Sequence, residues 1–370
     1  MILEDFFTRI EQQYNNKQPF VVYRKPKKTE VKGVLQSHDG LIFTKDFKEK
    51  GFVFSPFDDA EESVLIPFDV SEIISSSSNI LPMESSGQDI SVNEEEKQQH
   101  ISLVNKGIEA IKENKFEKVV LSRKEQVTLE KNNPVSIFKK LLNTYSSSFI
   151  YCWYHPKVGL WLGATPETLI KIEGSQFSIM ALAGTQNYTG NLDVIWQDKE
   201  KQEQKFVTDF IVDSLQTSVE SLNISEIETV KAGNLVHLKT MISARLKPDS
   251  KLKEIISKLH PTPAVCGVPK GASKQFILSN ENYNREFYTG FLGELNFETT
   301  SAPRSGKRNI ENRAYSITKK STQLYVNLRC MQIKNNTAII YVGGGITANS
   351  NPESEWGETV SKSLIIKNVL

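Results

Sequence analysis

The sequence predicts an α+β fold built from large sheets with helices packed outside them. Segments with strand patterns and segments with helix patterns follow one another in no regular order, and no repeat of fixed period is visible. The part up to about Pro67 is β-rich, because short apolar runs such as Phe20–Tyr23 and Gly51–Phe54 alternate with turn-forming residues. A chain of 370 residues exceeds two average domains, yet large folds of this kind can form one unit.

Beyond this part, the spacing of apolar residues predicts a series of further elements. The polar stretch Ser75–Lys97 is expected to be a mobile surface segment, and a helix with one apolar face is expected over 96–113. After Asn284 the pattern is again rich in strands. The other expected elements are strands at 118–121, 149–153, 160–162, 325–330 and 337–342, and helices at 136–146, 200–222 and 352–367.

The composition argues against several classes of partner. The formal net charge is +1, so no general electrostatic field for nucleic acid or a membrane surface is indicated. No apolar run approaches the roughly 20 residues that span a bilayer, and the acidic start Met1–Phe7 lacks the features of a secretory signal. Cys152, Cys266 and Cys330 lie in apolar contexts without metal-ligand spacing, so we expect buried free thiols in a reducing cytoplasm.

Two carboxylates in the C-terminal half are candidates for chemistry. Glu203 lies on a predicted helix whose apolar stripe, with Val207 and Ile211, runs toward it, so Glu203 should face the core. Glu358 lies on the last predicted helix. A carboxylate on such a surface is costly without a partner, and two of them could share a Mg²⁺ ion, which prefers hard oxygen ligands. The spacing alone leaves open that both are partly solvated helix charges.

Two further residues have the chemistry of a base and an acid. Lys118 opens a predicted strand and shares one face of it with Val120. Buried there it could serve as a base, although a lysine at a strand edge is more often a solvated charge. Glu167 follows a tight bend at Gly163–Pro166. In a poorly solvated pocket its carboxyl could stay protonated and act as a general acid, although a simple turn carboxylate is commoner.

Several other positions could contact an anionic substrate. Gly343–Gly345 would let the backbone approach a ligand and offer N–H groups to an anion, or would form a simple turn, and they match no nucleotide-binding motif. Arg329 ends a predicted strand. Lys362 lies four residues after Glu358, so it either forms only a helix salt bridge or points into the same site. The proline-rich loop His260–Pro269 would form a rigid wall.

These positions, in this order, resemble those of the chorismate-utilising enzymes, and within them the isochorismate synthases. Any one motif is weak, but ten in the correct order are very specific. They comprise residues 118–123, 164–167, 182–185, 203, 237–238, 260–269, 285–290, 328–330, 343–346 and 355–362. In this family the first hundred residues complete the same fold. The resemblance therefore implies one unit over 1–370, with a β-rich part at 1–95 and a motif-bearing core at 96–370.

The resemblance implies a role for each position. Lys118 would activate water to attack C2 of chorismate, and Glu167 would protonate the departing C4 hydroxyl, which gives isochorismate. Glu203 and Glu358 would hold the cofactor Mg²⁺, which orients the ring carboxylate. The residues expected to contact the substrate are Thr185, Ala264, Val265, Tyr288, Arg329, Gly343, Gly344, Gly345 and Lys362.

Two of these positions separate the branches of the family. Anthranilate synthases use ammonia and lack the water-activating lysine, whereas Lys118 is present, so no obligatory glutaminase subunit is expected. Relatives that expel pyruvate, such as salicylate synthases, typically carry threonine where this chain has Ala264, which implies a reaction that stops at isochorismate. A salicylate synthase and a chorismate-binding protein without turnover remain the alternatives. Isochorismate could feed menaquinone or siderophore synthesis.

The chain departs from the family pattern at three places. Gln204 replaces the histidine that often follows the metal-binding glutamate, which should affect only fine positioning. Lys239 replaces a residue that is usually small or apolar, and would alter substrate contacts if it faces the site. Residues 299–313, rich in Ser, Arg and Lys, are expected to form an extended hairpin loop.

Overall fold

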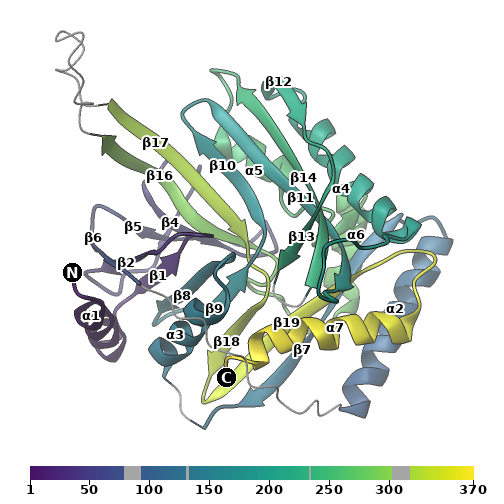
Figure 1. Ribbon diagram of the computed structural model, residues 1–370, viewed down its shortest axis with the longest axis horizontal. Helices are drawn as coiled ribbons and strands as arrows, with labels where there is room; N and C mark the ends of the chain where they lie inside the picture. The colour runs from purple at the N-terminus through teal and green to yellow at the C-terminus, as the bar shows by residue number, and fades with distance from the viewer. Residues whose placement is uncertain (79–92, 131–132, 233–234, 302–316) are drawn as a thin grey trace.

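The computed structural model describes residues 1–78, 93–130, 133–232, 235–301 and 317–370. Within these residues the strands form two sheets (Figure 1). The first sheet has nine strands, which are, from one edge to the other, β15 (Gly267–Val268), β7 (Lys118–Thr128), β19 (Thr337–Ile346), β18 (Cys330–Lys334), β9 (Gly159–Thr165), β8 (Phe149–His155), β1 (Phe20–Arg24), β2 (Glu30–Gln36) and β6 (Ser71–Ser77).

The second sheet has ten strands within the same described ranges. Every pairing in the two sheets is antiparallel. The strands of the second sheet are β12 (Val219–Ile224), β14 (Leu235–Leu246), β11 (Gln176–Asn187), β10 (Thr168–Glu173), β17 (Ile317–Val326), β16 (Phe291–Ser301), β4 (Gly51–Ser55), β5 (Val64–Pro67) and β3 (Ile42–Phe43), with β13 (Glu228–Ala232) paired to β14.

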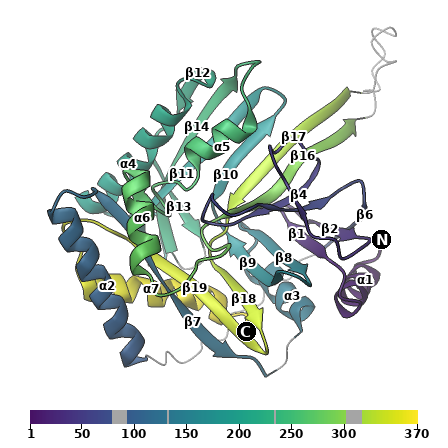
Figure 2. The same cartoon turned by 180° about the vertical axis from the view of Figure 1, so that it is seen from behind.

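The helices cover the outer faces of the two sheets (Figures 1 and 2). On the first sheet, α1 and α3 pack near β1 and β8, and α7 packs on β19 beside α2. On the second sheet, α4 and α5 cover β11 and β14, while α6 lies against β7 and β15 of the first sheet. The described helices are α1 (Leu3–Asn15), α2 (Glu94–Lys112), α3 (Pro134–Thr144), α4 (Asp198–Leu215), α5 (Leu252–Leu259), α6 (Lys270–Asn280) and α7 (Pro352–Lys367).

The strand patterns follow from burial on both faces. In β1, Phe20 and Val22 pack outward with α1 and α3, whereas Val21 and Tyr23 pack inward. The inward side chains meet those of the second sheet in an aromatic layer, where for example Phe149 and Tyr325 stack with ring centroids 4.0 Å apart. Two sheets therefore enclose one core between them, and three further cores lie under the helices, one of them under α2 and α6. This is the expected α+β arrangement of large sheets with helices outside.

Several sequence expectations need correction. The N-terminal part is not uniformly β-rich, because α1 precedes its strands. The helix expected over 200–222 ends at Leu215, and β12 follows it. The expected strand 325–330 is divided between β17 and β18, which belong to different sheets.

Two expectations fall partly or wholly outside the described residues. In the expected surface segment 75–97, residues 75–77 belong to β6 and residues 94–97 to α2, while 79–92 are not described. In the expected hairpin loop 299–313, residues 299–301 belong to β16, and the rest lies outside the described residues.

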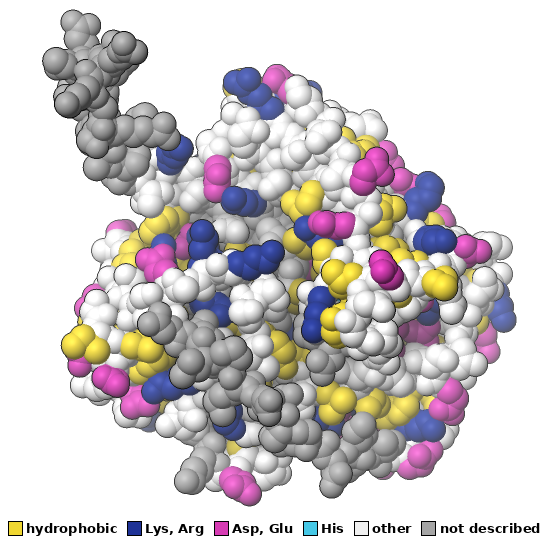
Figure 3. All heavy atoms as spheres, in the orientation of Figure 1, with side chains coloured by type: hydrophobic (Ala, Val, Ile, Leu, Met, Phe, Trp, Pro, Cys, Tyr) yellow, Lys and Arg dark blue, Asp and Glu magenta, His cyan; other side chains and the backbone are white. Residues whose placement is uncertain are grey.

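Two expectations about composition can be compared with the structure. All three cysteines are free and buried, as predicted. Among the described helices, none is long and apolar enough to cross a membrane. On the face shown in Figure 3, basic and acidic side chains are interspersed, in keeping with the formal net charge of +1.

Candidate active site

One cavity lies between the two sheets, beside the aromatic layer. Its wall includes all thirteen residues that the sequence predicts for the site, from Lys118 to Lys362. The first sheet contributes β7 and β19, the second contributes β11 and β14, and α4 and α7 add the two metal candidates Glu203 and Glu358. The structure therefore brings the predicted residues together, while their individual chemical roles stay predictions.

The cavity forms where two chain segments pass from one sheet to the other. Pro166 and Glu167 link β9 of the first sheet to β10 of the second, and residues 327–329 link β17 to β18 in the reverse direction. The two crossings are neighbours, because the Ala164 N–H donates to the Arg329 carbonyl and the Val326 N–H donates to the Glu167 carbonyl. Each crossing segment contributes a side chain to the cavity wall, Glu167 from the first and Arg329 from the second.

Glu167 is held in a poorly solvated place. It is 3% exposed, and burial raises its pKa to about 8, although nearby Lys118 and Arg329 act to lower it. At neutral pH the carboxyl is therefore mostly protonated. A protonated carboxyl that faces a cavity is a proton donor, which is the behaviour expected of a general acid.

Arg329 is fixed beside the acid by His237. One guanidinium nitrogen donates to the Ala232 carbonyl at 3.0 Å, and the other lies 2.7 Å from His237 Nε2. Burial and the neighbouring Arg329 lower the pKa of His237 to about 3, so its ring is neutral. Nδ1 lies 2.9 Å from the Gly184 carbonyl, which places the ring hydrogen on Nδ1 and leaves Nε2 to accept from Arg329. Arg329 itself has the left-handed φ of 48° that occurs in strained site residues.

Lys118 lies inside the wall rather than at a solvated edge. It is 1% exposed, and the strand alternation sends Val119 and Leu121 into the core under α2 and α6 while Lys118 and Val120 face the cavity. Its side-chain nitrogen Nζ lies 3.7 Å from Glu203 Oε2. A side chain at Gly345 would come within 2.9 Å of Lys118 Cε, so glycine at this position leaves room for the lysine.

Glu203 is the N-terminal member of the buried stripe of α4, with Val207 and Ile211 behind it, as the spacing predicts. The next residue, Gln204, is fully buried and donates to the Ala181 carbonyl and to Thr240. It therefore ties the helix to β11 and β14, which holds Glu203 in place. Lys239 does not line the cavity, because its ammonium pairs with Glu228 of the adjacent strand at 2.6 Å.

Two more carboxylates of α7 lie close to the glycines. Glu358 pairs with Lys362 at 2.6 Å, and Lys362 also donates to the Gly343 carbonyl at 2.9 Å. Glu355 is 1% exposed and pairs with Lys199 at 2.5 Å, while its second oxygen has no hydrogen-bond partner in the described residues. Burial raises the pKa of Glu355, although Lys199 opposes the shift. A Cβ at Gly344 would lie within 3.3 Å of Glu355 and 3.7 Å of Glu358.

These carboxylates fit a hard cation in their chemistry. Glu203 and Glu358 both face the cavity, and the buried Glu355 oxygen close to Gly344 lacks a partner in the described residues. Oxygen donors from two carboxylates are what Mg²⁺ takes from proteins, since it keeps several waters. Within the described residues, no three metal-ligating side chains are gathered in one group. Each carboxylate is instead paired with a lysine: Lys118, Lys362 or Lys199.

Gly343–Gly345 do not form a turn. They belong to β19, which pairs with β7 through Ile346 but with β18 only as far as Tyr341. Along this stretch, one edge of β19 therefore has no strand partner in the described residues, and the glycines line the cavity. Unpaired backbone N–H groups at such an edge can bind an anion.

Sequence reasoning missed three residues of this site. His237 lies in one of the family motifs without an expected role, and it orients Arg329. Lys199 and Glu355 form a buried pair at the carboxylate side. Their spacing gave a usable indication, since Lys199 lies four residues before Glu203 and Glu355 lies three residues before Glu358, which places each pair on one helix face.

Comparison with known proteins agrees with this site. A model of the chorismate binding enzyme family matches residues 58–306, and a second with the same description matches residues 315–368. The chain therefore belongs to the chorismate binding enzymes.

Individual relatives support the same family and fold. The isochorismate synthase MenF of Pasteurella multocida is 29% identical over 219 residues, which are 57% of this chain and 46% of the relative. The chain thus spans about half the length of the curated relatives it matches.

Solved structures match over nearly the whole chain. A Bacillus anthracis protein described as a 2,3-dihydroxybenzoate-specific isochorismate synthase, DhbC, has a TM-score of 0.77 at 20% identity, covering 98% of this chain and 99% of its own. Anthranilate synthase component I of Streptococcus pneumoniae has a TM-score of 0.63 at 15% identity, covering 94% and 92%. These likenesses establish the fold.

Proposed function

We propose that the protein is an isochorismate synthase that converts chorismate to isochorismate. The observation that carries the proposal is the pairing of a buried lysine with a protonated carboxyl in one cavity. Lys118 faces the cavity from the first sheet, and Glu167, with a pKa raised by burial to about 8, faces it from the crossing between the sheets. The relatives named isochorismate synthases support the same reaction.

The proposed reaction needs one base and one acid. Lys118 takes a proton from water as the water oxygen bonds to C2 of chorismate. The two conjugated ring double bonds shift and the C4–O bond breaks, and Glu167 supplies the proton with which the hydroxyl leaves as water. Water is consumed and released in equal amount, so the product is an isomer. Proton transfer from Lys118 back to Glu167 through solvent restores the starting states.

The rest of the cavity suits a dicarboxylate. Arg329 commits two of its five N–H donors to Ala232 and His237 in the described residues, so others remain for a substrate carboxylate. Tyr288, Thr185 and Gly343–Gly345, whose free strand edge carries backbone N–H groups of Gly343 and Gly345, complete the polar wall. These contacts would place the ring between the base and the acid, which is where orientation accelerates a reaction most.

We propose Mg²⁺ as the cofactor, held by Glu203 and Glu358. When bound, the ion would neutralise and orient the ring carboxylate of the substrate. The Glu355 oxygen that has no hydrogen-bond partner among the described residues, the neighbouring Gly344 and the hard oxygen donors support this assignment. In the metal-bound protein, Lys118 and Lys362 would exchange their carboxylate partners for other contacts.

Ala264 supports a reaction that stops at isochorismate. It lies in the cavity wall beside Val265, on a loop that turns tightly because the Val265 and Cys266 N–H groups both donate to the Thr262 carbonyl. The resemblance to the family implies that pyruvate-releasing relatives typically have a threonine hydroxyl at this position. Here the methyl group offers no hydroxyl donor or acceptor to the enolpyruvyl part of the substrate.

The test is incubation of the purified protein with chorismate, with and without Mg²⁺, followed by chromatography of the products and an assay for pyruvate. We expect isochorismate only with Mg²⁺, and no pyruvate. Salicylate with pyruvate would retain the fold and the base but refute the role of Ala264. An aromatic amine formed with ammonium salts would refute the assignment to water chemistry. Bound but unchanged chorismate would refute catalysis itself.

A further inference from the structure

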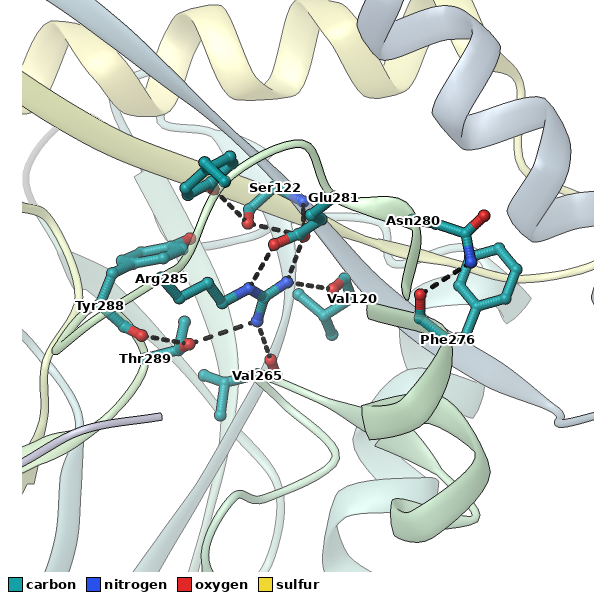
Figure 4. A network of polar contacts seen from close by, with 10 residues as sticks. Val120, Ser122, Val265, Phe276, Asn280, Glu281, Arg285, Tyr288 and Thr289 are labelled. Atoms are coloured by element: carbon teal, nitrogen blue, oxygen red, sulfur yellow. Dashed lines mark hydrogen bonds and ion pairs between the residues drawn. The ribbon is translucent and has the colours of Figure 1, made fainter. Parts of the chain in front are cut away.

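Beside the cavity lies a buried ion pair that the proposed reaction does not use. Glu281 caps the C-terminus of α6, and Arg285 follows four residues later, with both side chains 1% exposed (Figure 4). The guanidinium binds the carboxylate through two contacts, Nε to Oε2 at 2.7 Å and a terminal nitrogen to Oε1 at 2.6 Å. Such bidentate pairing fixes direction as well as charge.

All five N–H donors of Arg285 have partners. Besides the two contacts with Glu281, one terminal nitrogen donates to the Val120 carbonyl at 2.7 Å, and the other to the Val265 carbonyl at 3.1 Å and the Thr289 hydroxyl at 3.2 Å. The guanidinium also lies over the Phe57 ring, with its carbon 4.6 Å from the centroid. One side chain thus connects four segments that are distant in the sequence, as Figure 4 shows for the polar contacts.

The contacts follow the edge of β7 where its neighbour strand ends. Strand β15 has only two residues and pairs with Lys118 and Val119. The Val120 N–H still finds the Cys266 carbonyl at 2.7 Å, but further along the edge the partners are side chains. Arg285 donates to the Val120 carbonyl, and Glu281 accepts from the Ser122 N–H at 2.8 Å.

These contacts occur at every second residue of β7, as the hydrogen bonds to a partner strand would. Backbone groups of residues i and i+2 point to the same edge of a strand, and along β7 this edge presents Val120 and then Ser122. The ion pair supplies a donor to the first and an acceptor to the second, as a partner strand would. The Ser122 hydroxyl adds a contact to the same Glu281 oxygen at 2.8 Å. A free strand edge is thereby completed by two side chains.

The ladder has a direct connection to the chemistry of the cavity. Val120 lies two residues after Lys118 on the same face, so the register of this edge sets the position of the lysine. Val265 follows Ala264 in the loop beside β7 that forms the neighbouring part of the wall. Thr289 follows Tyr288, another wall residue, and its hydroxyl donates to the Tyr288 carbonyl at 2.6 Å.

We propose that the Glu281–Arg285 pair is a positioning unit that replaces a missing strand beside β7 and sets the distance between Lys118 and the Ala264–Val265 wall. Neither side chain belongs to the cavity wall, so the pair acts through the backbone. The inference rests on the proposed function for the roles of Lys118 and Ala264. It deepens that function by naming residues that set the geometry of water attack.

The first test variant is Arg285→Lys, which keeps the charge but offers one nitrogen in place of the planar five-donor fork. We expect kcat to fall by about 100-fold while KM for chorismate changes less than about threefold, because a displacement of about 1 Å of a catalytic group has this effect. Glu281→Gln is the second variant. Its amide replaces one acceptor with a donor, and we expect the same split between kcat and KM.

The matched control is Glu294→Gln. Glu294 is another carboxylate that is 1% exposed, and it is bound by Tyr23 at 2.6 Å and Lys25 at 2.5 Å, away from the cavity wall. Its substitution should lower thermal stability as much as the test substitutions do. It should leave kcat within about twofold, because substitutions at distant sites that share no partners act independently. If Arg285→Lys folds and keeps the wild-type kcat, the proposal fails. It also fails if all three variants lose turnover in proportion to stability.

A second readout separates this inference from the proposed function. Hydrogen exchange of the backbone amides at 118–122 and 264–266 should accelerate in Arg285→Lys and not in Glu294→Gln, whether or not chorismate is converted. If the wild-type protein gives no isochorismate but this exchange pattern holds, the proposed function fails while the ladder stands. If isochorismate forms and exchange at both segments is unchanged in Arg285→Lys, the ladder fails while the function stands.

Discussion

The two sides of the cavity differ in whether their buried carboxyl groups lie within ion-pair distance of a cation. On the side of the sheet crossing, Glu167 is buried without a cation within ion-pair distance in the described residues, and its pKa rises to about 8. On the helical side, Glu203, Glu358 and Glu355 each lie within ion-pair distance of a lysine. The same type of side chain is thus held without a close cation on one side and beside a lysine on the other.

The comparison teaches that pairing as well as burial decides what a buried carboxyl can do. Burial disfavours the charged form of a carboxyl, whereas a close lysine acts in the opposite direction. Glu167, on the link between the sheets, is 3% exposed and lies outside ion-pair distance of any described lysine, although Lys118 is near enough to act on its pKa. Five predictions test this division of labour, beginning with the largest expected effect.

Removing the base should have the largest effect. Lys118→Ala should reduce kcat by about 1,000-fold, a typical contribution of a positioned base, while chorismate still binds. Product chromatography and calorimetric titration with chorismate measure the two properties. Lys274→Ala is the matched control, because Lys274 pairs with Asp58 and Asp59 outside the cavity wall. Normal turnover by Lys118→Ala would refute the base.

Replacing a carboxylate on the helical side of the cavity should weaken the binding of Mg²⁺. Glu203→Gln and Glu358→Gln should each lower the affinity for Mg²⁺ by at least about tenfold, as expected when groups that hold a metal are lost. Isothermal titration of the substrate-free protein with MgCl₂ measures this without reliance on turnover. Glu228→Gln serves as control, because its carboxylate pairs with Lys239 away from the cavity wall. Unchanged affinity in both site variants would remove the metal assignment.

Glu167 should make the folding stability depend on pH with the sign opposite to that of an ordinary paired carboxylate. The folded-state pKa of Glu167, about 8, exceeds its ordinary value of 4.5, so its contribution to stability is full below 4.5 and is lost as pH rises through 8. Glu167→Gln should therefore lose less stability than the wild type between pH 5 and 9. Urea unfolding at both pH values measures the difference. Parallel loss in the two proteins would show that Glu167 is ionised when folded.

Turnover should follow the same titration. If Glu167 donates the proton, the activity of the wild type falls as pH rises through about 8.

The smallest effect is expected at the wall between the two sides. Ala264→Thr adds a hydroxyl to the cavity, and we expect a minor but measurable release of pyruvate from chorismate, with isochorismate still the main product. A coupled assay for pyruvate measures it, and Ala264→Val controls for added volume without a hydroxyl. Absence of pyruvate from the threonine variant would show that this position does not separate the two outcomes.

The sequence alone predicted much of this site because its residues belong to motifs that keep their order. Lys118 and Glu203 could also be placed by local periodicity, since strand and helix patterns show which face is buried. His237 and the Glu281–Arg285 pair were not recognised, because their contacts depend on which strands become neighbours. The division of 325–330 between two sheets was missed for a related reason. It depends on Arg329 taking a left-handed conformation, which is unusual for arginine.

The first helix shows a different kind of error. Phe6, Ile10 and Gln13 have helical spacing and are buried, so the pattern was present in the sequence. It was grouped with the strands that follow because those are short and numerous. The predicted helix at 200–222 extends too far for a different reason, because here a helical pattern continues into a strand. Val219 continues the apolar spacing from Leu215, but it pairs with Leu246 at the edge of the second sheet.

The two crossings beside the cavity also bear on how the molecule unfolds. Because the chain passes between the sheets at Glu167 and again at 327–329, neither sheet can come apart at this end without pulling on the other. The two sheets should therefore melt in one cooperative transition. A small ligand bound between the crossings would then raise the melting temperature of the entire molecule by mass action, although it contacts only a small part of each sheet.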